Sequence, residues 1–249
     1  MSSKITNRYL GDISWRDSSE FDSIDGNKVD VWRINVNTNL SFLDNFLLIM
    51  SFEEVVKARR FYQIKYRNRY IVGRGAIRNI LSKYYLDQPG AAIKFAEGVH
   101  KKPYLINSTN KKLFHNVSYS GDWILLAVAT SEIGVDTEQI NPHFNYREII
   151  RQVFNEEEVN YINDKLSPEQ FFLLWTRKEA LLKATGKGLD DDLKLIPCLN
   201  GIHSVQSDLI SSTEDWQISS FQIDDGNIAS VATGPLINEI RCWDIDLKA

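Results

Sequence analysis

The chain has 249 residues, of which 43% are hydrophobic and 25% charged, and its formal net charge is −4. This is the composition of an ordinary globular protein, long enough for one large domain or two small ones. The sequence has neither an apolar run near the roughly 18 residues that span a bilayer nor the apolar segment of a signal peptide. The two cysteines, Cys198 and Cys242, lack metal-site spacing and are expected to be buried, idle thiols, so a cytoplasmic protein is predicted.

Charge is distributed unevenly along the chain. Between Ser51 and Ser120 there are fourteen basic and four acidic residues, a balance of +10 that leaves −14 for the remainder. A basic block inside an acidic protein is typical of a site for a polyanion, either nucleic acid or a multiply phosphorylated nucleotide. Charge alone fits a solvated helix face equally well.

The first half of the chain reads as a polar leader followed by a strand, two helices and further extended segments. Residues 1–27 show no clear period and are expected to be loosely held. Ser51 and Glu54 have the spacing of a capping box, which predicts a helix to about Tyr62. The other predicted elements are a strand over Val29–Val36, a long helix from about Tyr66 to Tyr85, a loop over Ser118–Asp122 and a buried strand over Trp123–Thr130.

The second half repeats this order about 100 residues later. Capping-box spacing recurs at Asn155 with Glu158 and at Ser167 with Gln170, and the second of these predicted helices ends at Gly186. The other predicted elements are a strand over Ile133–Glu138, a hairpin of Trp216–Ile223 with Asn227–Thr233, and a last strand over Glu239–Ile245.

The repeated order predicts an α+β fold of two similar halves related by a pseudo-twofold axis. Each half is expected to hold a small, mainly antiparallel sheet and a long helix, with the active site in the cleft between the halves. The predicted division is a polar leader over 1–27, an N-terminal half over 28–131 and a C-terminal half over 132–249.

A candidate metal site lies on the predicted strand Ile133–Glu138. Asp136 and Glu138 are two residues apart, so both side chains point to one face of the strand. Paired carboxylates repel, and a hard divalent cation such as Mg²⁺ relieves that repulsion while it keeps water and phosphate ligands. An exposed acidic pair without a metal is the alternative.

The helix that ends at Gly186 presents a second candidate group. Trp175, Glu179 and Lys183 are spaced i, i+4 and i+8, so they follow one stripe of the helix. The alternative is an ordinary Glu–Lys surface pair, which stabilises a helix by only ~0.3–0.5 kcal/mol.

Together these segments resemble the 4′-phosphopantetheinyl transferase family. The resemblance rests on GVDTE (Gly134–Glu138), WTRKEALLKATGKGL (Trp175–Leu189), KARRF (Lys57–Phe61), RYIVGRGAIRNIL (Arg69–Leu81), KKP (Lys101–Pro103) and FHNVSYSGDW (Phe114–Trp123). The length resembles the long, monomeric type, which activates the carrier proteins of nonribosomal peptide, polyketide and fatty acid synthesis. The resemblance implies transfer of phosphopantetheine from coenzyme A to a serine of an apo acyl or peptidyl carrier protein, with release of 3′,5′-ADP.

The resemblance also implies roles for individual residues. Asp136, Glu138 and Glu179 match the Mg²⁺ carboxylates, and Glu179 is also the expected base for the carrier serine. Lys57, Arg69, Lys102 and Lys183 match basic positions that bind the phosphates of coenzyme A, and Ser118 and Tyr119 lie in the loop that lines the same pocket. Glu158 matches an acidic position near the metal, although its capping-box position explains it equally well.

Two residues depart from the family pattern. Tyr119 stands where the family usually has histidine, so it either donates a neutral hydrogen bond to a phosphate or packs as an aromatic wall. Glu54 stands where some relatives have lysine, and its capping-box position offers a local reason.

Two other functions are weighed against the transferase. A non-catalytic carrier-protein or nucleotide-binding relative is disfavoured because Asp136, Glu138, Glu179 and Lys183 are all retained. A nucleic-acid-binding protein is disfavoured because the basic block contains no recognition motif. The mixed segment Asn141–Ile150 is either a docking surface for the carrier or an ordinary loop packed on the core.

Overall fold

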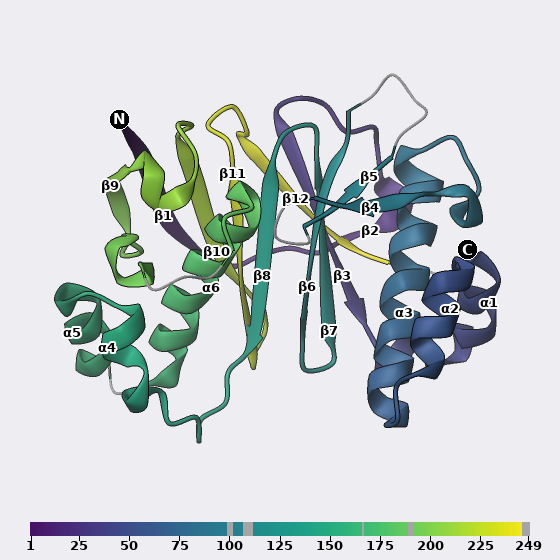
Figure 1. Ribbon diagram of the computed structural model, residues 1–249, viewed down its shortest axis with the longest axis horizontal. Helices are drawn as coiled ribbons and strands as arrows, with labels where there is room; N and C mark the ends of the chain where they lie inside the picture. Colours follow the sequence, from purple (N-terminus) through teal and green to yellow (C-terminus); the bar gives the residue numbers. More distant parts are fainter. Residues whose placement is uncertain (99–101, 107–111, 166, 189–191, 246–249) are drawn as a thin grey trace.

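The computed structural model describes the chain except residues 99–101, 107–111, 166, 189–191 and 246–249, drawn in grey in Figure 1. Three residues named or counted above therefore lie outside the described part of the chain. They are Lys101 of the KKP motif, Lys111 of the basic block and Leu189 at the end of WTRKEALLKATGKGL. Within the described part, no helix is both long and apolar enough to cross a membrane.

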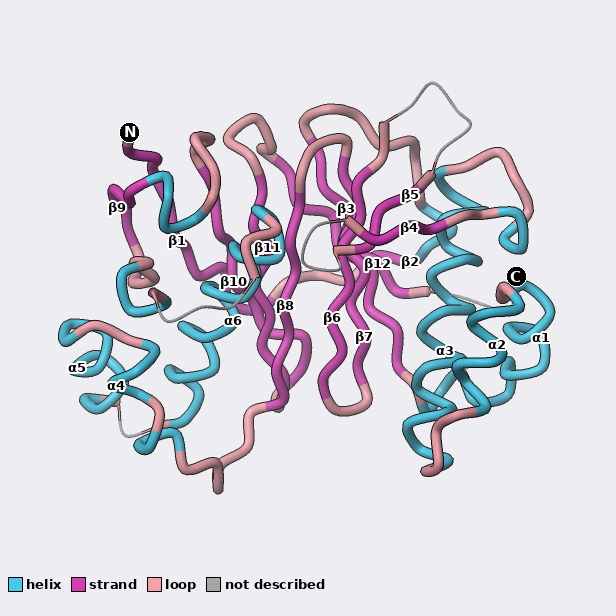
Figure 2. Tube along the Cα trace, in the orientation of Figure 1, coloured by secondary structure: helices cyan, strands magenta, loops and turns pink. Residues whose placement is uncertain are grey.

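Two five-stranded sheets stand next to each other in the middle of the molecule, and helices cover the outer side of each (Figures 1 and 2). One sheet has the order β8-β11-β10-β1-β9 and the other β2-β12-β3-β7-β6, while β4 and β5 form a separate pair. The strands are β1 (Ser2–Asp12), β2 (Arg16–Asp17), β3 (Lys28–Asn35), β4 (Phe95–Glu97), β5 (Pro103–Leu105), β6 (Phe114–Ser120), β7 (Trp123–Ala129), β8 (Ile133–Gln139), β9 (Gly201–Gln206), β10 (Trp216–Asp224), β11 (Asn227–Thr233) and β12 (Glu239–Asp244). The predicted α+β class with two halves is confirmed.

One long helix accompanies each sheet, α3 on the first half and α6 on the second (Figure 1). The α-helices are α1 (Leu43–Ile49), α2 (Phe52–Arg59), α3 (Ile64–Ile80), α4 (Ile150–Val153), α5 (Glu156–Asp164) and α6 (Pro168–Thr185). A π-helical turn, Leu81–Tyr85, continues α3. Apolar clusters fill the space between each sheet and its helices, and a third cluster with members from both sheets lies between them.

The helix signals of the sequence behave largely as predicted. The capping boxes at Ser51 and Asn155 both form and open α2 and α5. Ser167 caps α6 differently, because its hydroxyl accepts from the N–H of Glu169 instead of completing a box with Gln170. Helix α6 ends at Gly186 in the left-handed conformation, as expected of a glycine at that position.

Each end of the chain contributes a strand to the sheet of the opposite half. Strand β1 lies inside the sheet of the second half, parallel to β10 and antiparallel to β9. Strand β12 runs parallel to β3 in the sheet of the first half. Figure 1 accordingly places the N-terminus beside β9.

The expectation of a loosely held leader over residues 1–27 is therefore wrong. Along β1, Ser3, Ile5 and Asn7 alternate with more exposed residues, so the strand does have a buried face. Two of these three are polar and hydrogen-bond inside the fold, Ser3 to Ser207 and Asn7 to the carbonyl of Leu199. Because the buried face is polar, hydrophobic periodicity gave no strand signal.

Two further local predictions need correction. Ser118–Ser120 is the end of strand β6 and not a loop, and only Gly121 and Asp122 form the turn to β7. Helix α1, Leu43–Ile49, was not predicted at all. It is short, and its N-cap residue, Phe42, provides no side-chain hydrogen bond.

Candidate active site

The two sheets meet along β6 and β8, which are edge strands of their own sheets. The seam is closed by alternate side chains of β6 that accept hydrogen bonds from backbone N–H groups of β8. These bonds run from Val135 N to Asn116 Oδ1 (2.9 Å), from Thr137 N to Ser118 Oγ (3.2 Å) and from Gln139 N to Ser120 Oγ (2.8 Å). Polar side chains thus replace a backbone ladder at the boundary between the halves.

The same serines hold the predicted carboxylates of β8. The hydroxyl of Ser118 donates to Asp136 Oδ1 at 2.9 Å, and that of Ser120 donates to Glu138 Oε2 at 2.9 Å. Asp136 is buried, 4% exposed, although it carries a carboxylate. A buried carboxylate needs a nearby cation, and Lys183 provides one with its ammonium 2.6 Å from Asp136 Oδ1.

Helix α6 reaches this strand because Gly134 lets the two backbones touch. A Cβ at Gly134 would collide with the backbone of Ala180 and Ala184 in α6. The close crossing sets Glu179 and Lys183 beside Asp136, so the two predicted segments form one site. The glycine of the GVDTE motif thus has a packing role.

The three carboxylates are each hard to ionise in this position. Burial and the neighbouring Asp136 raise the pKa of Glu179 to about 7, against the lowering effect of Lys183. Burial also raises the pKa of Asp136 and of Glu138, and the charge of Asp136 adds to the shift in the pKa of Glu138. The site therefore concentrates acidic groups that favour an added positive charge.

The residues fit a hard divalent cation by their chemistry. Asp136 Oδ2 and Glu179 Oε1 are buried oxygens without a hydrogen-bond partner in the described part of the chain, and oxygen is the ligand that Mg²⁺ prefers. Among the described residues, no three carboxylate, imidazole or thiolate groups are arranged as a complete metal cluster. Lys183 occupies one side of Asp136 in this arrangement.

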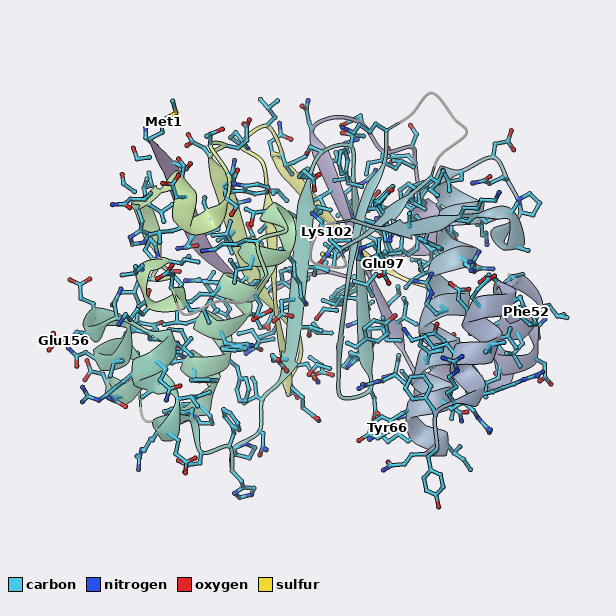
Figure 3. All side chains as sticks on the ribbon, viewed as in Figure 1. Met1, Phe52, Tyr66, Glu97, Lys102 and Glu156 are labelled. Atoms are coloured by element: carbon cyan, nitrogen blue, oxygen red, sulfur yellow. The ribbon has the colours of Figure 1, made fainter. Side chains whose placement is uncertain are left out.

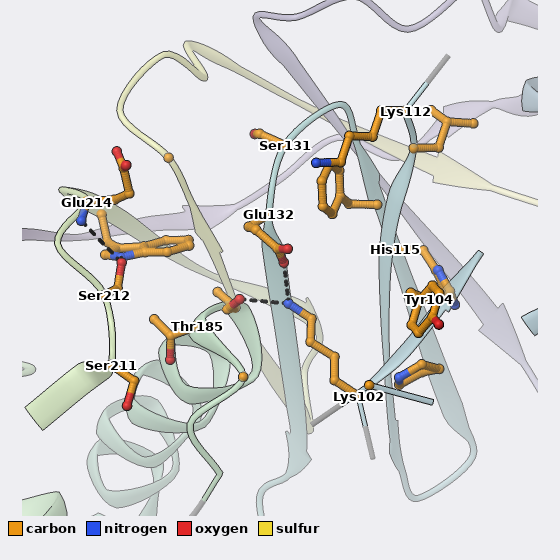
Figure 4. A pocket seen from close by; sticks show the side chains of 18 of the residues that line it. Lys102, Tyr104, Lys112, His115, Ser131, Glu132, Thr185, Ser211, Ser212 and Glu214 are labelled. Carbon is orange, nitrogen blue, oxygen red and sulfur yellow. Dashed lines mark hydrogen bonds and ion pairs between the residues drawn. The ribbon is translucent and has the colours of Figure 1, made fainter. Parts of the chain in front are cut away.

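A cavity of about 1110 Å³ opens beside the C-terminal end of α6, between the halves (Figure 4). Lys102 lies on its wall and near the middle of the molecule (Figure 3). Its ammonium is 2.6 Å from Glu132 and donates to the carbonyl of Ala184 at 2.7 Å. Lys102 thus bridges the first half to the end of α6, where Thr185 and Gly186 also line the cavity.

The other predicted phosphate-binding residues lie around β6 and the helices of the first half. Arg69 on α3 points to the turn after β6 and donates to the carbonyl of Gly121 at 3.5 Å. Lys57 on α2 stands 5.4 Å from the ring centre of Tyr70. Of the predicted residues, the structure brings Ser118, Asp136, Glu138, Glu179 and Lys183 together, while Lys57, Arg69 and Lys102 have their described contacts elsewhere.

Tyr119 points away from the carboxylates. It alternates with Ser118 and Ser120 along β6, and its ring and hydroxyl lie against the backbone of Gly73 in α3. Burial of the hydroxyl raises its pKa to about 12. This contact fits the alternative in which Tyr119 packs as an aromatic wall. The hydrogen bond from Tyr119 to a phosphate of coenzyme A stays a prediction.

Glu158 has local partners for both carboxylate oxygens. Oε2 accepts from the N–H of Asn155 and from Lys178, whose ammonium is 2.9 Å away, and Oε1 accepts from the N–H of Cys198. Glu54 is used in the same way in the first half, where it caps α2 and pairs with Arg78 at 2.7 Å. The local reason expected for both residues is therefore present, and each is tied to its own long helix.

Sequence reasoning missed His115, which also lines the cavity. The imidazole is 2% exposed, and neither ring nitrogen has a hydrogen-bond partner among the residues that the structure describes. The sequence gave no sign of this burial, because Ser118–Asp122 was predicted to be a loop. Strand β6 in fact includes Ser118–Ser120, and the alternation along it turns His115 away from the seam.

The fold and site define a class of protein. Two α+β halves join edge to edge, and one buried and two half-buried carboxylates lie with a lysine where the long helix of the second half packs on strand β8. The chain matches the family model described as the 4′-phosphopantetheinyl transferase superfamily over residues 132–232. It matches the one described as 4′-phosphopantetheinyl transferase, N-terminal, over residues 37–131.

Among curated proteins, the chain is 31% identical to the 4′-phosphopantetheinyl transferase HetI of Nostoc sp., over 87% of this chain and 92% of HetI. It is 30% identical to a putative 4′-phosphopantetheinyl transferase of Synechocystis sp., over 74% of this chain and 76% of the relative. It is 29% identical to the transferase Sfp of Bacillus subtilis, over 74% of this chain and 81% of Sfp.

The chain therefore belongs to the 4′-phosphopantetheinyl transferase family, in its long form. The family resemblance and the transferase function expected from the motifs are confirmed, and the non-catalytic relative is not favoured.

Proposed function

We propose that this chain transfers the 4′-phosphopantetheine arm of coenzyme A to a serine of an apo acyl or peptidyl carrier protein in a Mg²⁺-dependent reaction. The observation that carries the metal dependence is the pair of buried oxygens that no described residue hydrogen-bonds, Asp136 Oδ2 and Glu179 Oε1, beside Lys183. Asp136, Glu138 and Glu179 would hold the ion. When bound, Mg²⁺ would neutralise charge on the pyrophosphate of coenzyme A.

Glu179 is the proposed base of the reaction. Burial and the neighbouring Asp136 raise its pKa to about 7 while the site holds no added cation, and bound Mg²⁺ would favour the ionised carboxylate that a general base must present. The serine oxygen attacks the β-phosphorus, and the bond from that phosphorus to the bridging oxygen breaks. The serine proton passes to Glu179 directly or through water, and 3′,5′-ADP leaves.

Lys183 is proposed to stabilise the leaving phosphate. Its ammonium lies 2.6 Å from Asp136 and 3.1 Å from Ser118, so its position is fixed from two sides. A preorganised cation beside the breaking bond stabilises the charge that develops on the leaving oxygen. Ser118 then acts through Lys183 and Asp136 by orienting both.

The nucleotide is proposed to lie against the first half, which carries the basic block. Lys57, Arg69 and Lys102 would contact its phosphates, and Tyr119 would form one wall of the pocket. Lys102 supports this arrangement because it lines the cavity next to α6 and is only partly exposed. Charge-assisted contacts of this kind give the site its preference for a polyphosphate.

The carrier protein is proposed to dock on exposed residues of Asn141–Ile150. Tyr146 and Ile150 are buried in that segment, so they belong to the core, whereas Phe144 and Arg147 are exposed. An exposed aromatic and an exposed basic side chain in one short segment suit an acidic partner with an apolar contact. Substitution at Phe144 or Arg147 is expected to raise the KM for carrier and not that for coenzyme A.

A cytoplasmic, monomeric enzyme is proposed, without nucleic acid or membrane as partner. Cys198 and Cys242 are free, buried thiols, as expected, and this is usual in a reducing compartment. Both halves of the site come from one chain, so the proposed chemistry needs no second copy.

The test is the mass increase of an apo carrier protein after incubation with coenzyme A, Mg²⁺ and the enzyme. Asp136→Asn and Glu179→Gln keep side-chain size but should lower turnover by orders of magnitude, because each removes a ligand charge. Asp225→Asn, in the β10–β11 turn, is the matched control and should be active. EDTA should stop the wild-type reaction and Mg²⁺ restore it. Near-normal turnover of Asp136→Asn at saturating Mg²⁺ would overturn the metal assignment.

A further inference from the structure

The segment that joins α2 to α3 exposes apolar and basic side chains together. Tyr62 is fully exposed (100%), Ile64 is 64% exposed, and the exposed Tyr66 lies at the lower edge of the first half in Figure 3. Residues 59–67, here called the basic–aromatic segment, contain no acidic residue. The exposed cations of this segment are Arg59, Arg60, Lys65 and Arg67.

Helix stability does not explain most of these cations. Arg59 lies in the last turn of α2, where a positive charge is favourable. Lys65 and Arg67 lie at the start of α3, where the helix dipole makes a cation unfavourable, and that turn contains no acidic residue. Among the described residues, the only acidic group within 4 Å of the four cations is Asp122, 4.0 Å from the Lys65 ammonium. Apolar side chains exposed among such cations are typical of a surface that binds another molecule.

The start of α3 is next to the turn between β6 and β7. Lys65 reaches Asp122 of that turn, and Arg69, one helical turn further along α3, donates to the carbonyl of Gly121 at 3.5 Å. In Figure 1 the β6–β7 turn lies between α3 and β8 at the lower edge of the molecule. The basic–aromatic segment thus adjoins the end of the seam between the halves.

The same turn leads to the carboxylates of β8. A Cβ at Gly121 would lie 3.0 Å from the side-chain oxygen of Gln139, so the turn lies against the end of β8. Ser120, just before the turn, donates to Glu138 at 2.9 Å. The segment Asn141–Ile150 follows β8 directly. Neighbouring contacts therefore connect the basic–aromatic segment, the proposed metal site and the proposed docking segment of the second half.

We propose that the basic–aromatic segment is a second docking surface for the carrier protein, supplied by the first half. Exposed cations with exposed aromatic and aliphatic side chains complement an acidic protein surface that has an apolar contact. A molecule that docks here also lies beside Glu138, and the carrier is the macromolecule that the proposed reaction brings there. A folded domain of about 100 residues has a radius of gyration of about 13 Å, so it is wide enough to contact both halves. This inference rests on the proposed function, because the carrier is its substrate.

The experiment measures transfer to an apo acyl carrier protein that wild type modifies, at low and at high ionic strength. Arg60→Glu with Arg67→Glu replaces attraction by repulsion and should raise the KM for carrier about tenfold at low ionic strength and less at high. The kcat and the KM for coenzyme A should not change. Isothermal titration calorimetry without coenzyme A should show the same loss in the Kd for the apo carrier.

Two further double variants complete the comparison. Tyr62→Ser with Ile64→Ser removes apolar contacts, so it should raise the carrier KM to the same extent at both ionic strengths, and it keeps the test available if the charge reversal does not fold. Lys4→Glu with Lys194→Glu is the matched control, because it reverses two exposed cations of the second half and changes the net charge equally. The control should keep the wild-type KM for carrier.

The outcomes separate this inference from the proposed function. Equal increases of the carrier KM in the control and in Arg60→Glu with Arg67→Glu would show an effect of net charge alone and overturn it. An increase in the KM for coenzyme A instead would assign the cations to the nucleotide. Loss of binding to phosphatidylserine vesicles with an unchanged carrier KM would assign the segment to a lipid surface, and both results would overturn the docking surface. Failure of wild type to modify any apo carrier would count against the proposed function itself, and this inference would fall with it.

Discussion

At the scale of single residues, the site depends on carboxylates that the fold holds in an unfavourable state. Asp136 is buried and is stabilised by Lys183 and Ser118, while its Oδ2 has no partner among the described residues. Glu179 approaches the same place from α6, and its pKa rises to about 7 because the group is buried and two other carboxylates are near. The strain is local and electrostatic, and a bound cation would relieve it, which is the pattern of a functional site.

His115 should make the stability of the folded protein depend on pH. Burial lowers its pKa to about 3 in the folded protein, against an ordinary value of 6.5, with Arg74 and Lys102 as its charged neighbours. Below pH 6.5 the unfolded chain therefore binds a proton that the folded chain does not, so stability falls as pH falls towards 3. From pH 7 to pH 5.5 the expected loss from this residue is about 1 kcal/mol.

The measurement is the free energy of unfolding in urea at both pH values. His115→Phe has no titrating ring at this position, so its loss over the interval should be smaller by that amount. The other ionisable groups contribute equally to both proteins and cancel in the comparison. The same pH dependence in wild type and in His115→Phe would mean that the imidazole is not held neutral.

Most of the candidate site could be predicted from the sequence, because residue spacing suggested two groups of side chains and the family resemblance joined them. Alternation on a strand placed Asp136 with Glu138, and helical spacing placed Glu179 with Lys183. The link between these segments is the crossing at Gly134, which no local pattern encodes. The use of Ser118 as a bridge to Asp136 was equally hidden, because it depends on two edge strands that meet only in the folded chain.

At the scale of elements, both long helices are held by a capping-box carboxylate. Glu54 caps α2 and pairs with Arg78 of α3, and Glu158 caps α5 and pairs with Lys178 of α6. Each cation goes on to bind backbone carbonyls of a neighbouring segment. The capping boxes were visible in the sequence, but the buried partners were not, because Arg78 and Lys178 are far from the boxes along the chain.

Glu158→Gln should therefore destabilise the fold without weakening the metal site. The side chains of Glu158 and Lys178 are each 1% exposed, so the variant leaves a buried ammonium without its counter-charge. Loss of one partner of such a pair typically lowers the free energy of unfolding by about 3–5 kcal/mol. Urea unfolding measures the loss, and Mg²⁺ titration of the folded variant should give the wild-type affinity.

Glu156→Gln is the matched control, since Glu156 is an exposed acid in the first turn of the same helix. Its effect should stay within about 0.5 kcal/mol. The double variant Glu158→Gln with Lys178→Met should recover part of the lost stability, because the stranded charge is gone. A Glu158→Gln protein of normal stability and impaired Mg²⁺ binding would contradict this prediction and would mean that Glu158 belongs to the metal site.

At the scale of the whole molecule, the exchange of terminal strands joins the halves. The repeated order of elements predicted two halves, and the two sheets with their helices agree with that. The partners of β1 and β12 were beyond prediction, because β1 pairs with β10 and β12 with β3, each about 200 residues away along the chain. Pairings at that separation leave no periodic trace in the sequence. The division at residues 131 and 132 stays a prediction as a boundary between folding units.

The exchange predicts that a fragment of residues 132–249 will not fold alone. Without β1, strands β10 and β9 lose the strand that lies between them, and β12 lacks β3 to pair with. Exposed strand edges and an opened core favour an unfolded or aggregated fragment. The fragment alone should show a poorly dispersed ¹H–¹⁵N spectrum and no cooperative thermal transition. Co-expression with residues 1–131 supplies both missing pairings, so the two pieces should purify together and melt in one transition. A dispersed spectrum from 132–249 alone would show that the second half folds without the exchanged strand, and the halves would then be independent domains.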